Sequence, residues 1–177
     1  YMLSGTVRYE GTNKLGRSTS ARWLPTWNIS GAWNAHEEKF CQTLEPTLSN
    51  FTLKASYLLT ADRGPADVSN SLVIIQSYNP WRPFTNVKES GLLLKDVENS
   101  ALTYEKKHEL NIGAEIGFID NRINFAIDWY KRDNYDLIGL VNSAGTGVKI
   151  TKFANVASMK SHGVELTLST KNIRTKD

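Results

Sequence analysis

The sequence predicts an all-β fold, an antiparallel segment of a transmembrane β-barrel with about six strands. The first reason is a hairpin, because residues 109–118 and 123–132 alternate between apolar and other side chains and residues 119–122 form a short polar turn. The second is strand length. Residues 109–118 and 123–132 each form a strand of ten residues, whereas about 9 to 11 residues span a bilayer and about 5 to 6 are typical of globular domains. The third is that the other face of these strands is too polar for a sandwich core without partners.

The same period of two residues predicts further strands along the chain. They cover residues 1–9, 25–34, 51–60 and 160–170. Trp23 and Trp33 have the same parity, and the rise of a tilted strand separates them by roughly 25 Å along the membrane normal. We therefore expect them at the two aromatic girdles of a membrane protein. The polar connection 35–50 leaves room for a helical turn.

The predicted connections alternate between long and short. Those at 10–24, 61–103 and 133–159 share one end of the strands, and those at 35–50 and 119–122 share the other. Outer-membrane barrels have this asymmetry, with long extracellular loops and short periplasmic turns. The segment 61–103 has little sustained period and is interrupted by proline, so we expect an extracellular loop region that contacts a partner or a substrate.

Composition limits the class of protein. The chain has 177 residues, and a hydrophobic share of 40% excludes a disordered protein. No apolar run approaches the roughly 18 residues of a membrane-spanning helix, so a bilayer would be crossed by strands. A net charge of +3 from scattered basic residues gives no reason to expect a nucleic-acid partner. The lone Cys41 permits neither an internal disulfide nor a cysteine-based metal site.

The sequence lacks the residue patterns of an enzyme or of a metal site. His36, His108 and His162 are far apart and do not have the spacing of zinc ligands. Glu37 and Glu38 are adjacent, whereas a pair of catalytic carboxylates must flank one scissile bond. Neither a nucleophile elbow nor a phosphate-binding loop is present in the sequence. We therefore predict no catalytic residue, no metal ligand and no cofactor.

Two groups of side chains are candidates for contact with a ligand or with another part of a larger protein. Polar residues of the alternating strands are predicted to face the barrel lumen, where water or a plug satisfies them. They are Asn111, Glu115, Asn124, Asp128, Tyr130 and Glu165. Aromatic residues assigned to loops are predicted to contact substrate or partner, because flat apolar faces stack on sugar rings. They are Trp23, Tyr78, Trp81 and Phe84. The alternative is that these aromatic residues pack the long loop against itself.

The predicted hairpin and the strand that follows it carry a distinctive series of short motifs. They are N-I-G-A-E-I-G-F at 111–118, N-R-I at 121–123, D-W-Y at 128–130, D-L-I at 136–138, N-V-A-S-M at 155–159 and G-V-E-L at 163–166. In these motifs, and over nearly its whole length, the chain resembles the SusC-like (SusC/RagA-type) TonB-dependent outer-membrane transporters of Bacteroidetes. His162 stands where this family usually has Lys, and Ser100 where it often has Pro. Neither departure disturbs the alternation.

This resemblance implies the function and the surroundings of the chain. It implies a plugged barrel of about 22 strands in the outer membrane of a Gram-negative bacterium, in contact with outer-membrane lipid. Residues 1–177 would be an internal piece from the C-terminal half of a single barrel domain, with the plug and the remaining strands outside this sequence. The family imports a glycan or peptide nutrient, with a SusD-like surface lipoprotein as a lid and the TonB complex, reached through the plug region, as the energy source.

A soluble β-sandwich is the competing interpretation, either a carbohydrate-binding module or a glycosidase domain. In a sandwich the apolar faces of the strands would form a core, whereas in a barrel they face lipid. We predict that Ile112, Ile116, Ile127 and Leu166 face lipid. We also predict that the first and last strands are open edges, because about six strands are fewer than the smallest membrane barrel needs.

Overall fold

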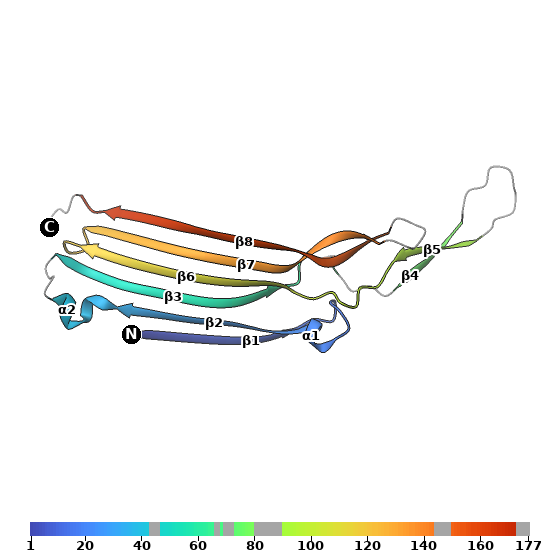
Figure 1. Ribbon diagram of the computed structural model, residues 1–177, viewed down its shortest axis with the longest axis horizontal. Coiled ribbons are helices and arrows are strands. Elements are labelled where there is room, and N and C mark those ends of the chain that lie inside the picture. The colour runs from blue at the N-terminus through green and yellow to red at the C-terminus, as the bar shows by residue number, and fades with distance from the viewer. Residues whose placement is uncertain (43–46, 66–67, 69–72, 80–89, 144–149, 173–177) are drawn as a thin grey trace, which may run out of the picture.

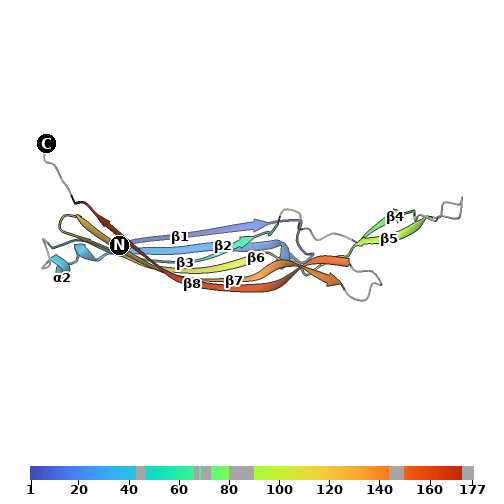
Figure 2. The ribbon, with the colours of Figure 1, turned by 90° about the horizontal axis from the view of Figure 1, so that it is seen from above.

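The computed structural model describes residues 1–42, 47–65, 68, 73–79, 90–143 and 150–172. These residues form a long, curved, six-stranded antiparallel sheet with the strand order β1-β2-β3-β6-β7-β8, and a separate two-stranded sheet of β4 and β5 (Figures 1 and 2). The strands are β1 Met2–Gly11, β2 Trp23–Asn34, β3 Leu48–Asp62, β4 Ile74–Tyr78, β5 Gly91–Asp96, β6 Glu105–Phe118, β7 Ile123–Ser143 and β8 Ile150–Thr170. The helical turns are α1 Thr19–Arg22, η1 Ala35–Glu37 and α2 Lys39–Gln42. No helix in the described part of the chain is long and apolar enough to cross a membrane.

The register of the sheet sets large apolar residues of neighbouring strands against one another on one face. Directly opposite pairs that share this face are Val7 and Trp27, Ile29 and Tyr57, Ile112 and Trp129, and Ile127 and Leu166. Because successive side chains of a strand point to opposite faces, a slip of one residue would mix apolar and polar residues. The observed register therefore confirms the alternation predicted for each strand.

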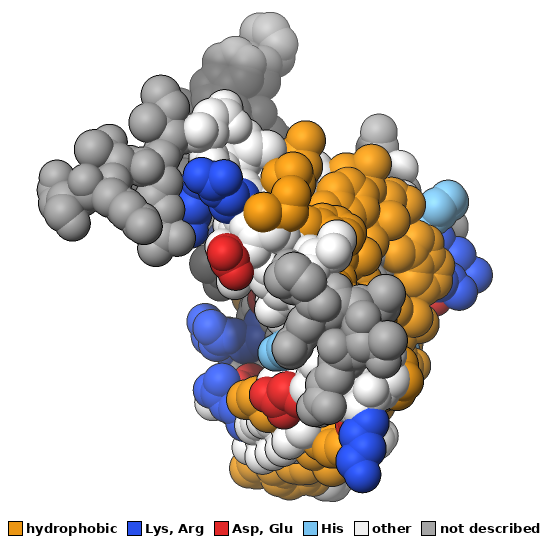
Figure 3. Space-filling view, turned by 90° about the vertical axis from the view of Figure 1, so that its left-hand side faces the viewer, with side chains coloured by type: hydrophobic (Ala, Val, Ile, Leu, Met, Phe, Trp, Pro, Cys, Tyr) orange, Lys and Arg blue, Asp and Glu red, His pale blue; other side chains and the backbone are white. Residues whose placement is uncertain are grey.

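The apolar face of the sheet is exposed in the described part of the chain. Leu166 is 64% exposed, Ile112 48% and Ile127 37%, while Ile116 is half-buried by its neighbours. Seen end-on, hydrophobic side chains gather on one side of the molecule (Figure 3). A continuous exposed apolar surface of this kind is typical of a lipid or protein contact and is unfavourable in water. The described residues form no second layer over this face, which the sandwich interpretation would require.

The short-turn end of the sheet is closed by compact connections. In the turn between β6 and β7, Ile119, Asp120 and Asn121 all have positive φ, between 52° and 56°. Asp and Asn tolerate this left-handed conformation, whereas the β-branched Ile119 does so at a cost. At the same end, Glu38 accepts hydrogen bonds from the Tyr1 hydroxyl (2.5 Å) and the Trp33 indole (3.3 Å), which lower the pKa of this carboxyl.

Stacked aromatic pairs lie at both ends of β2. Trp33 stacks on Tyr1 with ring centroids 6.2 Å apart, and Trp23 stacks on Tyr9 at 5.3 Å. Both tryptophans lie on the apolar face, as their shared parity predicts. Aromatic rings at the two limits of an apolar band are characteristic of the interfaces of a membrane protein.

The loop end of the sheet differs from the sequence-based expectation in two places. The predicted loop 133–159 is wrong, because β7 continues to Ser143 and β8 already begins at Ile150. Asp136 has a positive φ of 58°, and the register shifts between Asn134 and Ile138. This bulge interrupts the period of two residues, so the alternation that predicts a strand is lost beyond it. The predicted loop 61–103 also contains β4 and β5, which have only five and six residues.

The enclosed hydrophobic cluster of the chain lies at the loop end. Leu15, Val68, Leu102 and Tyr104 are at most 3% exposed. Leu24, Ala61, Ile138 and Phe153 pack against this cluster. The cluster joins the connection after β1 to the segment before β6. The long connections are therefore held against the sheet by packing as well as by chain continuity.

Replacing Leu166 by Arg tests which face of the sheet meets lipid. Near the bilayer midplane an outward Arg costs about 2 to 4 kcal/mol, because its charge loses water. The matched control is Thr167→Arg, whose side chain lies on the polar face of the same strand. Folding of the intact barrel into lipid vesicles along a urea series measures both variants. Equal destabilisation by the two substitutions would contradict the assignment of the faces.

Candidate functional site

The candidate site is the polar face of the sheet. The predicted lumen-facing residues Asn111, Glu115, Asn124, Asp128, Tyr130 and Glu165 all lie on this face, opposite the apolar one. The register sets Asn111 against Tyr130 and Asp128 against Glu165. β6, β7 and β8 therefore bring these residues side by side although they are far apart in sequence.

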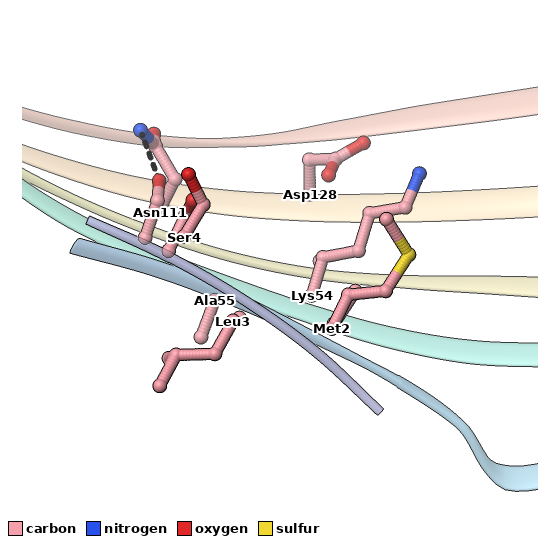
Figure 4. A pocket seen from close by; sticks show the side chains of 12 residues that line it. Met2, Leu3, Ser4, Lys54, Ala55, Asn111 and Asp128 are labelled. Atoms are coloured by element: carbon pink, nitrogen blue, oxygen red, sulfur yellow. Dashed lines mark hydrogen bonds between the residues drawn. The ribbon is translucent and has the colours of Figure 1, made fainter. Parts of the chain in front are cut away.

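A hollow of about 430 Å³ lies over β1, β2, β3, β6 and β7. Its polar lining residues include Ser4, Ser30, Lys54, Ser56, Asn111 and Asp128. Figure 4 shows Ser4, Lys54, Asn111 and Asp128 projecting to one side of the strands, while Leu3 and Ala55 project to the other. The lining of the hollow thus combines these polar side chains with glycines and apolar residues, among them Met2 and Ala32.

Glu109 is the most enclosed charged group on the polar face. It is 8% exposed and lies 2.6 Å from Lys107 Nζ and 3.2 Å from Arg132 Nε. The Asn111 amide donates a hydrogen bond of 3.1 Å to Glu109 and a weaker one of 3.4 Å to the Ser56 hydroxyl. An enclosed carboxylate is tolerated only with such partners, because desolvation of an unpaired charge is costly.

This Glu109 network was missed by the sequence analysis. Lys107, Glu109 and Asn111 share the parity of the polar face, which is visible in the sequence. The register of β6 and β7 brings Arg132 opposite Glu109, as the predicted hairpin with its turn at 119–122 also implies. The guanidinium also lies over the Tyr130 ring, 4.4 Å from its centroid. Arg132 thus contacts both Tyr130, which was predicted to face the lumen, and Glu109, which was not among the predicted site residues.

Two motif glycines leave room for side chains of the neighbouring strand on the polar face. A Cβ at Gly113 would collide with the carboxylate of Asp128, which stands opposite in the register. A Cβ at Gly163 would lie 2.6 Å from the Tyr130 hydroxyl. Glycine within a strand often marks such a close approach. The glycines of the motifs therefore let the polar side chains lie flat across the sheet.

The other predicted lumen residues make fewer contacts. Glu115 pairs with Lys54, and the Asn124 amide donates a hydrogen bond to the carbonyl of Asn121 at 2.9 Å. Asp128 and Glu165 are exposed and face each other as like charges. This surface carries both charge signs and many hydrogen-bonding groups, which suits contact with water or with another polar surface. The described residues contain no group of side chains that could hold a metal ion.

The predicted loop contacts lie in different environments. Trp23 is 45% exposed and lies on the apolar face over Gly11, not in a loop. Tyr78 is 53% exposed at the end of β4. Trp81 and Phe84 lie outside the described residues. Contact of any of these four residues with a substrate stays a prediction.

Asn155 joins three elements at the loop end. Its side-chain oxygen accepts a hydrogen bond from the backbone N–H of Thr103, and its amide donates to the carbonyl of Thr103, both at 2.9 Å. The amide also donates to the carbonyl of Asp136, in the β7 bulge, at 2.5 Å. Two residues before Asn155, the carbonyl of Phe153 accepts a bond of 2.7 Å from the Asn99 amide. The first residue of the N-V-A-S-M motif therefore has a structural role.

The connection between β1 and β2 is fixed to the same region. The backbone N–H of Gly16 donates to the carbonyl of Leu102 at 2.8 Å, and Arg17 forms an ion pair with Glu98 at 2.7 Å. The Tyr104 hydroxyl donates to the carbonyl of Arg22 at 3.2 Å. Burial raises the pKa of Tyr104 above its ordinary value.

Comparison with known proteins gives a consistent result. No protein-family model matches the chain. The chain is 27% identical to the TonB-dependent receptor SusC of Bacteroides thetaiotaomicron over 180 residues, covering 100% of this chain and 18% of the receptor. It is 23% identical to the TonB-dependent receptor P3 of Formosa agariphila, covering 100% of this chain and 17% of that receptor.

Solved structures of similar proteins agree with the sequence relatives. The RagAB peptide importer in its 'open-open' state matches 99% of this chain with a TM-score of 0.80 and 25% identity, over 18% of the importer chain. Its 'closed-closed' state gives a TM-score of 0.77 at 24% identity, with the same coverage. The chain thus spans less than a fifth of the length of these relatives.

The sequence and the structure therefore lead to the same family. The curated relatives match nearly the whole chain, and the six-stranded sheet matches one part of a receptor barrel. This confirms the predicted fold class and the resemblance stated above. Over nearly its whole length the chain is similar to part of the barrel wall of SusC/RagA-type TonB-dependent receptors, which are outer-membrane β-barrel transporters.

Proposed function

We propose that the protein of which this chain is a part is an active importer of peptide or oligosaccharide nutrients, energised by the TonB complex. The observation that carries this proposal is the match of the whole six-stranded sheet to the RagAB peptide importer at a TM-score of 0.80. The exposed apolar face supports it, because such a sheet suits the wall of a barrel in lipid. The similarity to the RagAB peptide importer favours peptide as substrate, and the SusC resemblance adds oligosaccharide.

In this proposal residues 1–177 belong to a single barrel domain. β1 and β8 form the two edges of the sheet and do not pair with each other in the described part of the chain. In hydrocarbon every unpaired backbone N–H or C=O costs several kcal/mol, so both edges need neighbouring strands. Further strands and a plug, which Asn111, Glu115, Asn124, Asp128, Tyr130 and Glu165 would face across the lumen, complete the barrel.

The β4–β5 hairpin is the proposed contact for the SusD-like lipoprotein lid. It extends beyond the sheet at the loop end (Figure 1). Ile75 and Leu92 share one face of the hairpin and are 59% and 80% exposed. Exposed apolar patches of this kind mark protein interaction sites. The position beyond the long-loop end agrees with a partner at the cell surface.

The proposed transport is tested by uptake into cells that express the intact receptor together with its lipoprotein. Fluorescent oligopeptides and oligosaccharides of matched size are supplied separately, and accumulation in the periplasm is measured. Because TonB transmits the proton-motive force, an uncoupler is expected to abolish uptake of the true substrate class. Uptake that persists in uncoupled cells would contradict active import, and accumulation of neither class would contradict the proposed substrates.

The orientation is tested by cysteine labelling in intact cells after Cys41→Ser, which removes the buried native thiol. In cells that express the receptor without its lipoprotein, a membrane-impermeant maleimide is expected to label the Leu92→Cys variant, at the long-loop end. It should not label the Asp120→Cys variant, in the short turn at the other end. Lysed cells provide the control, in which both variants react. The reverse pattern of labelling would invert the proposed topology.

The lid contact is tested by the double substitution Ile75→Asp with Leu92→Asp. Charges in the apolar patch are expected to weaken binding of the purified lipoprotein about tenfold or more, as for other interface anchors. The matched control is Gln76→Asp, which adds a charge to the opposite face of the same strand. An equal loss of affinity in the control would assign the effect to the net charge of the hairpin instead of to the patch.

A further inference from the structure

On the apolar face of β7 and β8, apolar residues give way to ionisable residues toward the loop end. On β7 the outward residues Phe125, Ile127 and Trp129 are followed by Lys131 and Asp133. On β8 the outward residues Leu168, Leu166 and Val164 are followed by His162 and Lys160. The ionisable residues keep the parity of the apolar ones, so they continue the same face. They are lipid-side residues and not lumen residues.

The register gathers these ionisable residues into one patch. Lys131 lies opposite His162, and Asp133 lies opposite both Lys160 and His108. We call His108, Lys131, Asp133, Lys160 and His162 the border patch. Lys131, Lys160 and His162 are exposed, and only Asp133, 3.6 Å from Lys131 Nζ, carries a negative charge. The border patch therefore carries a positive excess at the limit of the apolar face.

A hollow of about 380 Å³ lies at the border patch. It is lined by Tyr57, His108, Leu110, Lys131 and Asp133. The His108 ring stacks between Tyr57 and Tyr135, with centroid distances of 5.7 and 5.6 Å. Asp133 Oδ1 is enclosed yet has no hydrogen-bond partner in the described part of the chain. The hollow thus combines aromatic surface, a lysine ammonium and an unused carboxylate acceptor.

The position of the patch restricts the kind of ligand that can reach it. Leu110 lines the hollow, and the exposed Ile112 and Val164 continue the same apolar face along β6 and β8. A ligand at this place must combine apolar chains with a headgroup that carries negative charge. A hydroxyl donor on the headgroup would satisfy Asp133 Oδ1, and a sugar ring would suit the aromatic surface. A phosphorylated glycolipid meets all of these requirements.

We propose that the border patch binds the phosphorylated sugar headgroup of a glycolipid in the outer leaflet of the membrane. Lys131, Lys160 and His162 contact the phosphate, and Asp133 accepts a hydrogen bond from a sugar hydroxyl. The acyl chains lie along Leu110, Ile112 and Val164. The assignment to the outer leaflet rests on the proposed function, which puts the long-loop end outside the cell. The binding chemistry itself depends only on the residues of the patch.

The test uses the intact receptor in a nonionic detergent, with diphosphorylated lipid A and the same lipid after phosphatase treatment as probes. Native mass spectrometry measures binding of each. The Lys131→Gln with Lys160→Gln variant is expected to bind the phosphorylated lipid about tenfold more weakly, corresponding to about 1.4 kcal/mol. The single His162→Gln variant, which keeps both lysines, is expected to lose about threefold.

The matched control is Lys54→Gln, which removes the same charge from the opposite face of the sheet and is expected to leave lipid binding unchanged. An equal loss in this control, or equal binding of the dephosphorylated lipid by the unaltered receptor, would overturn the proposal.

Inorganic phosphate is not expected to displace the lipid, because it lacks acyl chains. If inorganic phosphate displaced the lipid, the patch would be a site for a free anion, and the lipid proposal would be wrong. Lipoprotein binding and substrate uptake by the Lys131→Gln with Lys160→Gln variant and by the His162→Gln variant are expected to be unchanged, which separates this proposal from the proposed function.

Discussion

The ladder of backbone hydrogen bonds across the six strands is the constraint on which every other feature of the sheet depends. A strand in lipid has no water to satisfy its N–H and C=O groups, so each must find a neighbouring strand. Pairing in one register then decides the direction of every side chain, because the period is two residues. The pairs Ile127–Leu166 and Asp128–Glu165 follow each other along β7 and β8, one on each face. A single register thus produces both an apolar surface and a polar surface.

Around Glu109 the groups of the polar surface satisfy one another within the sheet. Glu109 has two cations and an amide around it, and Arg132 is supported by the Tyr130 ring. Gly113 and Gly163 make the space in which Asp128 and Tyr130 lie across the neighbouring strand. Two of the motifs by which the chain resembles its family, N-I-G-A-E-I-G-F and G-V-E-L, therefore have a physical explanation. Each sets a glycine on one strand beside a large polar residue on the next.

The sequence predicted the features that depend on uninterrupted alternation and missed those that depend on register. Residues 109–118 and 123–132 keep a period of two without a break, and the hairpin β6–β7 matches them at the turn. The strands beyond Asn134 were missed because the bulge at Asp136 breaks the period, and β4 and β5 are too short to establish one. The Glu109 network was not predicted, although the predicted hairpin with its turn at 119–122 already sets Arg132 opposite Glu109. Trp23 was assigned to a loop, yet it is the first residue of β2.

The packing at the loop end explains how a projecting hairpin can have a defined position. The chain leaves β5 at Asp96 and reaches β6 at Glu105. Between these points Glu98 is paired with Arg17, Asn99 is bonded to Phe153, and Thr103 is bonded twice to Asn155. The buried side chains of Leu102 and Tyr104 add a hydrophobic contact in the same stretch. These contacts tie the base of the hairpin to β8 and to the connection after β1. A force that a bound partner exerts on the hairpin would therefore be transmitted to the sheet, because these contacts hold the segment between β5 and β6.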